Sequence, residues 1–325
     1  MRRTRWFTMV AAVMAIALVG VACGGDESSD TADGGGTALS GDIRIDGSST
    51  VGPLTEAAAE FFQEENPDVR VTVGISGTGG GFEKFCAGET DANDASRQIE
   101  TDEEELCTTA GVEWVEMQVA NDGIAVVINP ENDWADNLTV EQLKMIWNDG
   151  SKINNWNQVD PSFPDVPLEL FGPGTDSGTF DYFTDAINGE EGVSRTDYQA
   201  TEDDNVAVQG VAGSKGGMAY FGLSYYEQNA DKLKVVAIDG GSGPVLPSVE
   251  TVQSGEYAPL SRPLFIYPSV AALQRPEMAA FMQFYLDNAA SIAEQALFVP
   301  ITAEQTEAAQ AVLDGIVGGA SPSAE

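Results

Sequence analysis

Short apolar runs alternate with amphipathic segments along most of the chain from residue 42 onward. The run "IRI" precedes residues 53–65, whose apolar positions fall on one face of a helix, and the strand-like run "VRVTV" follows the turn "NPD". This order predicts a β-α-β unit at the start of the folded region.

The same alternation continues to about residue 317. The unbroken apolar run "IAVVIN" predicts a strand that is buried on both faces. Thr139 and Gln142 form a capping box ahead of the helix "VEQLKMIW", and Thr101 with Glu104 predicts a second one. Further strands are predicted at "PLELF", "GMAYF", "KVVAI" and "PLFIY", followed by two or three helices from Pro276 onward. Alternating strands and helices predict an α/β fold with mixed, mainly parallel strands, in two sheets rather than one.

The first 41 residues and the last seven do not fit this pattern. Three arginines followed by an uncharged, mostly apolar stretch predict an export signal over residues 1–22. Cys23 stands where bacterial lipoproteins carry their lipid, although Gly20 departs from the usual leucine three residues earlier, and simple secretion is the alternative. Residues 23–41 then form a flexible linker to the membrane, and residues 319–325 are expected to be disordered. The predicted location is therefore the outer face of the cell membrane, or the periplasm or medium if Cys23 is not lipidated.

Composition narrows the possible functions. The 325 residues carry 15 Lys plus Arg against 52 Asp plus Glu, a formal charge of −37, which argues against nucleic-acid binding. There is no histidine, so the commonest general base and metal ligand is missing, and we expect neither a cofactor nor a metal. In an exported chain, Cys86 and Cys107 are expected to form a disulfide.

Three loops share one design, "IDGSSTVGPL", "GISGTGGGFEKF" and "FGPGTDSGTFDYF". Each runs from a strand through glycine and hydroxyl residues into a helix, and so offers backbone N–H groups, hydroxyls and a helix N-terminus to an anion. Arg97, in "DANDASRQI", adds a cation that can pair with a tetrahedral oxyanion, the alternative being a surface salt bridge. Together these loops predict an oxyanion site.

The ordered motifs "DGSSTVGPL", "SGTGGGFEKFCAGETDANDASRQI", "PGTDSGTF", "EDDNVAVQGVAGSKGGMAYFG" and "PLSRPLFIY" resemble the PstS family of phosphate-binding proteins, which feed the bacterial high-affinity phosphate ABC transporter. The resemblance implies a type II periplasmic-binding-protein fold that closes on one phosphate ion and passes it to membrane permease subunits. It implies a first lobe from residues 42–118 and 262–318, a second lobe from residues 119–261, and hinge strands near 119–125 and 261–265. A monomer without enzymatic activity is expected.

Carried over position by position, the resemblance implies phosphate ligands from all three loops and from Arg97. This chain reads "ASR" where well-known members read "ASD", and it has Pro173 where they carry an arginine, so Asp176 is the substitute candidate for accepting the phosphate proton. Glu83 and Asp94 are weaker candidates for that role. The predicted ligands are Ser49, Thr50, Thr78, Arg97, Asp176, Ser177, Gly178 and Thr179.

Two alternatives stay open. The same fold can bind sulfate, molybdate or tungstate. An exported phosphatase or serine hydrolase could instead use Ser49 or Ser177 as a nucleophile, but without histidine such a serine needs another base, and no Ser-x-x-Lys pairing lies in these loops.

Overall fold

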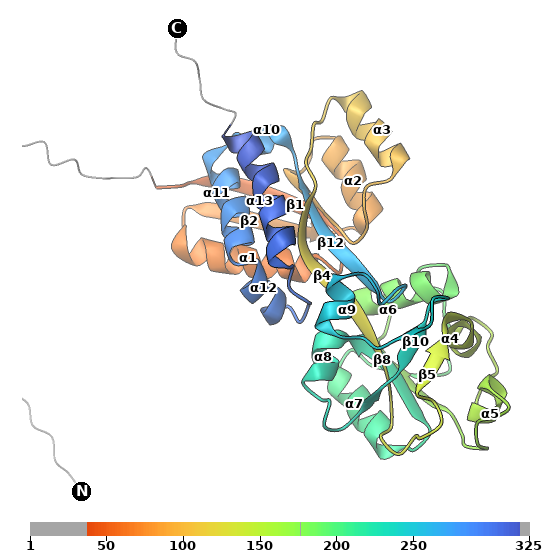
Figure 1. Cartoon of the computed structure of the whole chain (residues 1–325). Coiled ribbons are helices and arrows are strands. Elements are labelled where there is room, and N and C mark those ends of the chain that lie inside the picture. Colours follow the sequence, from red (N-terminus) through yellow and green to blue (C-terminus); the bar gives the residue numbers. More distant parts are fainter. Residues whose placement is uncertain (1–37, 176, 319–325) are drawn as a thin grey trace, which may run out of the picture. The chain divides into compact units, whose positions relative to one another are not determined.

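The computed structural model describes residues 38–175 and 177–318, and its first elements alternate strictly between strand and helix (Figure 1). The predicted signal peptide, linker, Cys23, Asp176 and residues 319–325 lie outside the described residues. The first elements are β1 (Gly41–Gly47), α1 (Gly52–Glu65), β2 (Val69–Ile75), α2 (Thr78–Cys86), β3 (Ala92–Ala95) and α3 (Thr101–Ala110).

The central part of the chain begins with one long strand. Its twelve residues include all of the predicted run "IAVVIN" except the final asparagine and are buried almost throughout. The elements are β4 (Met117–Ile128), β5 (Asn137–Thr139), α4 (Val140–Trp147), α5 (Trp156–Val159), β6 (Glu169–Gly172), α6 (Gly178–Phe183), the π-helix η1 (Thr184–Asn188), β7 (Gln199–Ala200), α7 (Asp204–Gly213), β8 (Gly217–Gly222), α8 (Leu223–Glu227), β9 (Lys234–Val235), β10 (Ala237–Asp239), β11 (Pro244–Val245) and α9 (Val249–Gln253).

A second long strand and the predicted closing helices complete the described chain. They are β12 (Ser261–Pro268), α10 (Val270–Leu273), α11 (Pro276–Asp287), α12 (Ala289–Gln295) and α13 (Ala303–Val317). No helix within residues 38–175 and 177–318 is long and apolar enough to cross a membrane.

The strands form a mixed sheet that is continuous through β4. In the described residues it has nine strands, in the order β2-β1-β3-β12-β4-β8-β6-β7, with β9 also pairing with β4. The predicted two sheets are therefore the two ends of one sheet, because β4 pairs with β12 in one half and with β8 in the other. A separate small sheet contains β11, β10 and β5.

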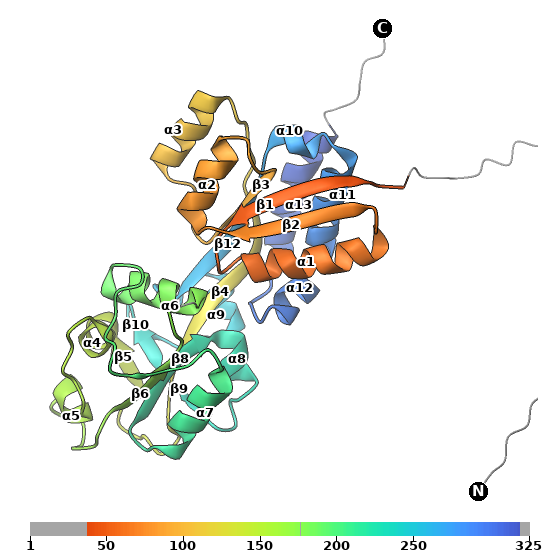
Figure 2. The ribbon, with the colours of Figure 1, turned by 180° about the vertical axis from the view of Figure 1, so that it is seen from behind.

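Two large apolar cores define two lobes. One core unites β1, α1 and β2 with the C-terminal helices, and Figure 2 shows α1 lying along β2. The other is built almost entirely from residues 124–260. β4 contributes residues to both cores. β12 follows Leu260 of the second core, contributes Leu264 and Ile266 to the first, and pairs antiparallel with β4, so these two strands carry the chain from one lobe to the other. Hereafter the first lobe is the one containing β1, and the second lobe the one containing α6. The boundaries predicted for them at residues 118, 261 and 318 stay predictions.

Helix caps test the sequence predictions at single residues. The capping box of Thr139 and Gln142 at α4 is confirmed, since Thr139 Oγ1 accepts from the Gln142 amide at 3.1 Å and the Thr139 amide donates to Gln142 Oε1 at 2.9 Å. The box predicted from Thr101 and Glu104 is wrong by one residue: Glu100 is the N-cap, and Glu103 completes the box. Arg97 also forms a salt bridge with Glu103, and the prediction from neighbouring residues did not include that contact.

The predicted disulfide is present. Cys86 and Cys107 are bonded, with their Cα atoms 4.4 Å apart, and both side chains are buried. The bridge ties the end of α2 to α3 inside a small apolar cluster that also includes Phe82, Phe265 and Tyr267.

Replacing both cysteines by serine is expected to destabilise the fold by about 3 kcal/mol, because the disulfide closes a loop and so lowers the conformational entropy of the unfolded chain. The free energy of unfolding, measured by chemical denaturation, checks this value. Anion binding should survive, since neither sulfur lies in the cleft described below. Two titratable thiols in the native, oxidised protein would contradict the assignment.

Candidate functional site

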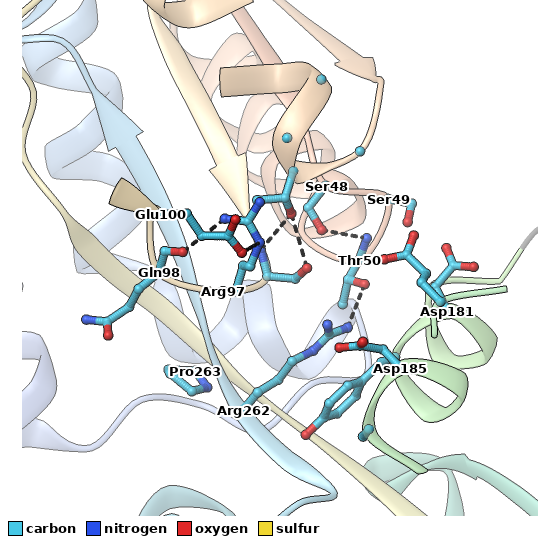
Figure 3. Close-up of a pocket in the computed structure, with 18 of the residues that line it drawn as sticks. Ser48, Ser49, Thr50, Arg97, Gln98, Glu100, Asp181, Asp185, Arg262 and Pro263 are labelled. Carbon is cyan, nitrogen blue, oxygen red and sulfur yellow. Dashed lines mark hydrogen bonds and ion pairs between the residues drawn. The ribbon is translucent and has the colours of Figure 1, made fainter. Parts of the chain in front are cut away.

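A cleft of about 820 Å³ lies where β1, β2 and β3 end, facing α6 and η1 of the second lobe (Figure 3). The parallel strands β1, β2 and β3 place their carboxyl ends at one edge of the sheet, where the loops lead into helices. The lining comprises Ser48, Ser49, Thr50, Ser76, Gly77, Thr78, Gly79, Gly80, Ser96, Arg97, Gln98, Glu100, Asp181, Tyr182, Asp185, Ala186, Glu191, Pro259, Ser261, Arg262 and Pro263.

The first loop follows β1 and brings Ser49 and Thr50 to the cleft, as predicted. Ser48 holds the turn, because its Oγ accepts from the amides of Thr50 at 3.1 Å and Val51 at 3.4 Å. The Thr50 amide, which the resemblance implies as a ligand, therefore already has a partner in this structure. The Thr50 and Ser49 hydroxyls lie at the cleft surface.

The second loop contains the glycine run that begins α2. Gly77 adopts φ +78°, a left-handed conformation that glycine favours, and this turns the chain sharply from β2 into the helix. Thr78, Gly79 and Gly80 then line the cleft at the helix N-terminus, where the first amides have no acceptor within their own helix. Thr78 Oγ1 accepts from the Ser96 amide at 3.2 Å, which ties the second loop to the end of β3.

Arg97 lines the cleft, but its guanidinium is paired within the first lobe. Nη1 and Nη2 each donate to a carboxylate oxygen of Glu103 at 2.8 Å, and Nε lies 3.2 Å from Glu100. The side chain is 37% exposed. The alternative considered from the sequence, a salt bridge, is thus the state seen here, and anion binding by Arg97 stays a prediction.

The third loop approaches the first from the second lobe. Ser177 caps α6 by accepting from the Thr179 amide at 3.2 Å, and Gly178 packs against Thr50. Ser177, Gly178 and Thr179 are half-buried and are not among the residues that line the cleft. From this helix, Asp181 and Tyr182 line the cleft, and Figure 3 shows the Asp181 side chain beside Ser49.

Carboxylates dominate the wall of the second lobe. Asp181, Asp185 and Glu191 all line the cleft. Burial and the charge of Glu191 raise the pKa of Asp181, while Arg262 and a hydrogen bond with Ser49 oppose the increase. An anion in this cleft therefore needs cations and hydrogen-bond donors close to it. A carboxylate with a raised pKa also accepts a proton from a ligand more readily.

Two weaker candidates for the proton acceptor lie outside the cleft. Glu83 is exposed on α2, and Asp94 is fully buried on β3. Asp94 Oδ1 accepts from Thr55 Oγ1 at 2.9 Å, and its Oδ2 has no partner among the described residues. Burial, together with the charges of Asp46 and Glu56, raises the pKa of Asp94 to about 8 against the opposing hydrogen bond from Thr55.

Arg262 is a cleft residue that the sequence analysis did not single out. Its motif, "PLSRPLFIY", indicated only a hinge strand. The side chain contacts Thr50, Asp122 and Tyr182, each from a distant part of the chain. No pattern of neighbouring residues shows that Arg262 meets these three partners, so nothing in the sequence identified Arg262 as a cleft residue.

Comparison with known proteins agrees with this architecture. Residues 29–289 match the model of the PBP superfamily domain. Protein SphX of Synechocystis sp. is 49% identical over 265 residues, 81% of this chain and 79% of that protein. The phosphate-binding protein PstS of Staphylococcus saprophyticus is 40% identical over 301 residues, 91% of this chain and 90% of that protein.

A solved structure extends the comparison to three dimensions. The crystal structure of a possible phosphate binding protein from Planctomyces limnophilus superposes with a TM-score of 0.83 at 47% identity, covering 86% of this chain and 99% of that one. The fold and the interlobe cleft thus define a solute-binding protein of the periplasmic type. Within the PBP superfamily, this chain belongs to the PstS family of phosphate-binding proteins.

Proposed function

We propose that the protein captures inorganic phosphate in the cleft and delivers it to an ABC importer in the membrane. The observation that carries the proposal is the convergence of hydroxyl-bearing loops and the N-terminus of α2 on one cleft between two lobes. These donors suit a small tetrahedral oxyanion. The relatives named for phosphate binding support phosphate as that anion.

The proposed ligands are those predicted from the sequence: Ser49, Thr50 and Thr78 from the first lobe, and Ser177, Gly178 and Thr179 from the second. The last three reach the anion only if the third loop comes nearer to the cleft, as lobe closure would bring about. Asp176 is proposed to accept the phosphate proton, and Asp181 is a second candidate because it already faces the cleft.

Arg97 enters the proposal as a ligand that exchanges its bonds to Glu103 for bonds to the anion. If it does so, Arg97→Ala should weaken phosphate binding about thirty-fold or more, because truncating one partner of a desolvated charge pair typically costs about 2–5 kcal/mol. Titration calorimetry checks this value. An affinity within about threefold of wild type would remove Arg97 from the site and leave it as the partner of Glu103.

We also propose that the chain is exported through residues 1–22 and anchored by a lipid on Cys23, and that it acts as a monomer. The resemblance of the N-terminal residues to a lipoprotein signal supports this part. Mass spectrometry of the mature protein tests it, since a mature chain that starts at an unmodified residue other than Cys23 would contradict the anchor.

Titration calorimetry with phosphate, sulfate and molybdate tests the function itself. Phosphate should bind most tightly, since the proposed acceptor carboxylate discriminates against a fully ionised anion. Tight binding of sulfate or molybdate without phosphate binding would assign another oxyanion. Assay with a chromogenic phosphate ester covers the enzymatic alternative, and any turnover that depends on Ser49 or Ser177 would overturn a purely binding role.

A further inference from the structure

Arg262 occupies the point where the two lobes and the connecting strands meet. It lies at the start of β12, lines the cleft, and its side chain is only 17% exposed. Nη2 donates to Thr50 Oγ1 at 3.0 Å, Nε lies 3.3 Å from Asp122 Oδ2, and the guanidinium carbon stands 3.7 Å from the centre of the Tyr182 ring (Figure 3). These partners belong to the first loop, β4 and α6.

The two arginines of the cleft differ in how many of their guanidinium nitrogens already have a partner. Arg97 has all three of its guanidinium nitrogens within ion-pair distance of Glu100 or Glu103. For Arg262, no described residue accepts a hydrogen bond from Nη1, although the side chain borders the cleft. A half-buried guanidinium with a free donor at a cleft surface is suited to bind a ligand oxygen.

The bond to Thr50 prepares a second donor. Because Arg262 donates to Thr50 Oγ1, that oxygen uses a lone pair for the arginine, and its own hydrogen remains available to another acceptor. The guanidinium and the hydroxyl are thereby presented side by side. Stacking on Tyr182 fixes the plane of the guanidinium and limits its rotation.

Acidic side chains outnumber basic ones in the lining of the cleft, which makes the positive charge of Arg262 important for an anion. Four carboxylates line the cleft, those of Glu100, Asp181, Asp185 and Glu191, against the two arginines. Asp122 is buried beside Arg262 and offsets part of its charge. The lining therefore has a formal charge of −2 with Arg262 and −3 without it, and loss of Arg262 would further disfavour any anion.

We propose that Arg262 is the cationic anchor of the bound oxyanion, through its free Nη1 donor and together with the Thr50 hydroxyl. This inference rests on the proposed function and adds to it a residue that the sequence analysis did not assign. Because β12 carries the chain between the lobes, the anchor lies beside both walls of the cleft rather than on a single lobe.

Titration calorimetry with inorganic phosphate tests the assignment. Arg262→Gln should weaken binding about thirty-fold or more, and Arg262→Lys should restore part of that loss by returning the charge without the planar fork. Arg70→Gln, which removes a positive charge from an exposed position on β2 outside the cleft, is the matched control and should bind within about threefold of wild type.

Loss of Arg262 alone leaves Asp122 buried without its partner, which can impair folding. The double variant Arg262→Gln/Asp122→Asn avoids this problem, and Asp122→Asn alone retains the cation. Asp122→Asn should bind phosphate at least as tightly as wild type, and the double variant should be as weak as Arg262→Gln. Wild-type affinity in the double variant would overturn the assignment of Arg262, whereas failure of the wild-type protein itself to bind phosphate would overturn the proposed function.

Discussion

A valine at position 178 is expected to reduce phosphate affinity about a hundredfold or more while leaving the ligand-free fold stable. Gly178 begins α6 in the second lobe, and a Cβ there would stand 2.6 Å from Thr50 Oγ1 and 3.2 Å from the Thr50 backbone nitrogen. Overpacking of this kind typically costs about 1–3 kcal/mol with a single added group, and valine adds more than one. The cost can be relieved by separating the lobes, but separation removes the contacts that closure on a ligand requires.

Phosphate titration and thermal unfolding of the ligand-free protein together check this prediction. Gly178→Ala should give a smaller loss, of roughly tenfold. Gly213→Val serves as the control, because a Cβ at Gly213, at the end of α7, would meet no atom within 4 Å. Undiminished affinity in Gly178→Val would show that Gly178 and Thr50 do not lie close together in the phosphate-bound protein.

Asp94 should make the protein progressively less stable as the pH rises from about 4 to about 8. Burial raises its pKa from the ordinary 3.8 to about 8, so between these values the folded chain holds a proton that the unfolded chain releases. The stability that this group contributes is complete below pH 3.8 and is lost as the pH rises through 8. Since each pKa unit corresponds to about 1.4 kcal/mol, the full effect is of the order of several kcal/mol.

Asp94→Asn removes this titration and keeps an oxygen that can accept from Thr55. The variant is expected to exceed wild type in free energy of unfolding by at least about 2 kcal/mol at pH 9, with the difference shrinking toward pH 5. Urea denaturation across this range measures the difference. Asp68→Asn, at an exposed turn, gives the background effect of removing one negative charge. A difference between Asp94→Asn and wild type that does not change with pH would contradict a neutral, buried Asp94.

The sequence was most informative where the structure depends on nearby residues. α1, α4 and β4 follow from local periodicity and caps, and the three glycine-rich loops could be placed at strand ends because parallel strands end at one sheet edge. The run "KVVAI" shows the limit of such reasoning. It was predicted as one strand, but β9 pairs with β4 and β10 pairs with β5, so the run is divided between two sheets.

Part of the candidate site was predictable because some of its residues lie close together along the chain. Ser49, Thr50 and Thr78 belong to loops whose chemistry is visible in a few consecutive letters. The partners of Arg97 and Arg262 are set by tertiary structure: Glu103 belongs to the next helix, and Thr50 lies 212 positions from Arg262. A single sequence does not contain that geometry.

The position of β12 also bears on how the chain reaches its fold. β12 is the last strand of the described chain, yet it lies between β3 and β4 in the sheet. During synthesis the second lobe can assemble its core from contiguous residues, whereas β3 waits with an unpaired edge until residue 268 has emerged. Such an edge is a site of aggregation until it is covered. The first lobe, which holds two of the three loops predicted to bind the anion, is therefore the later of the two to become complete.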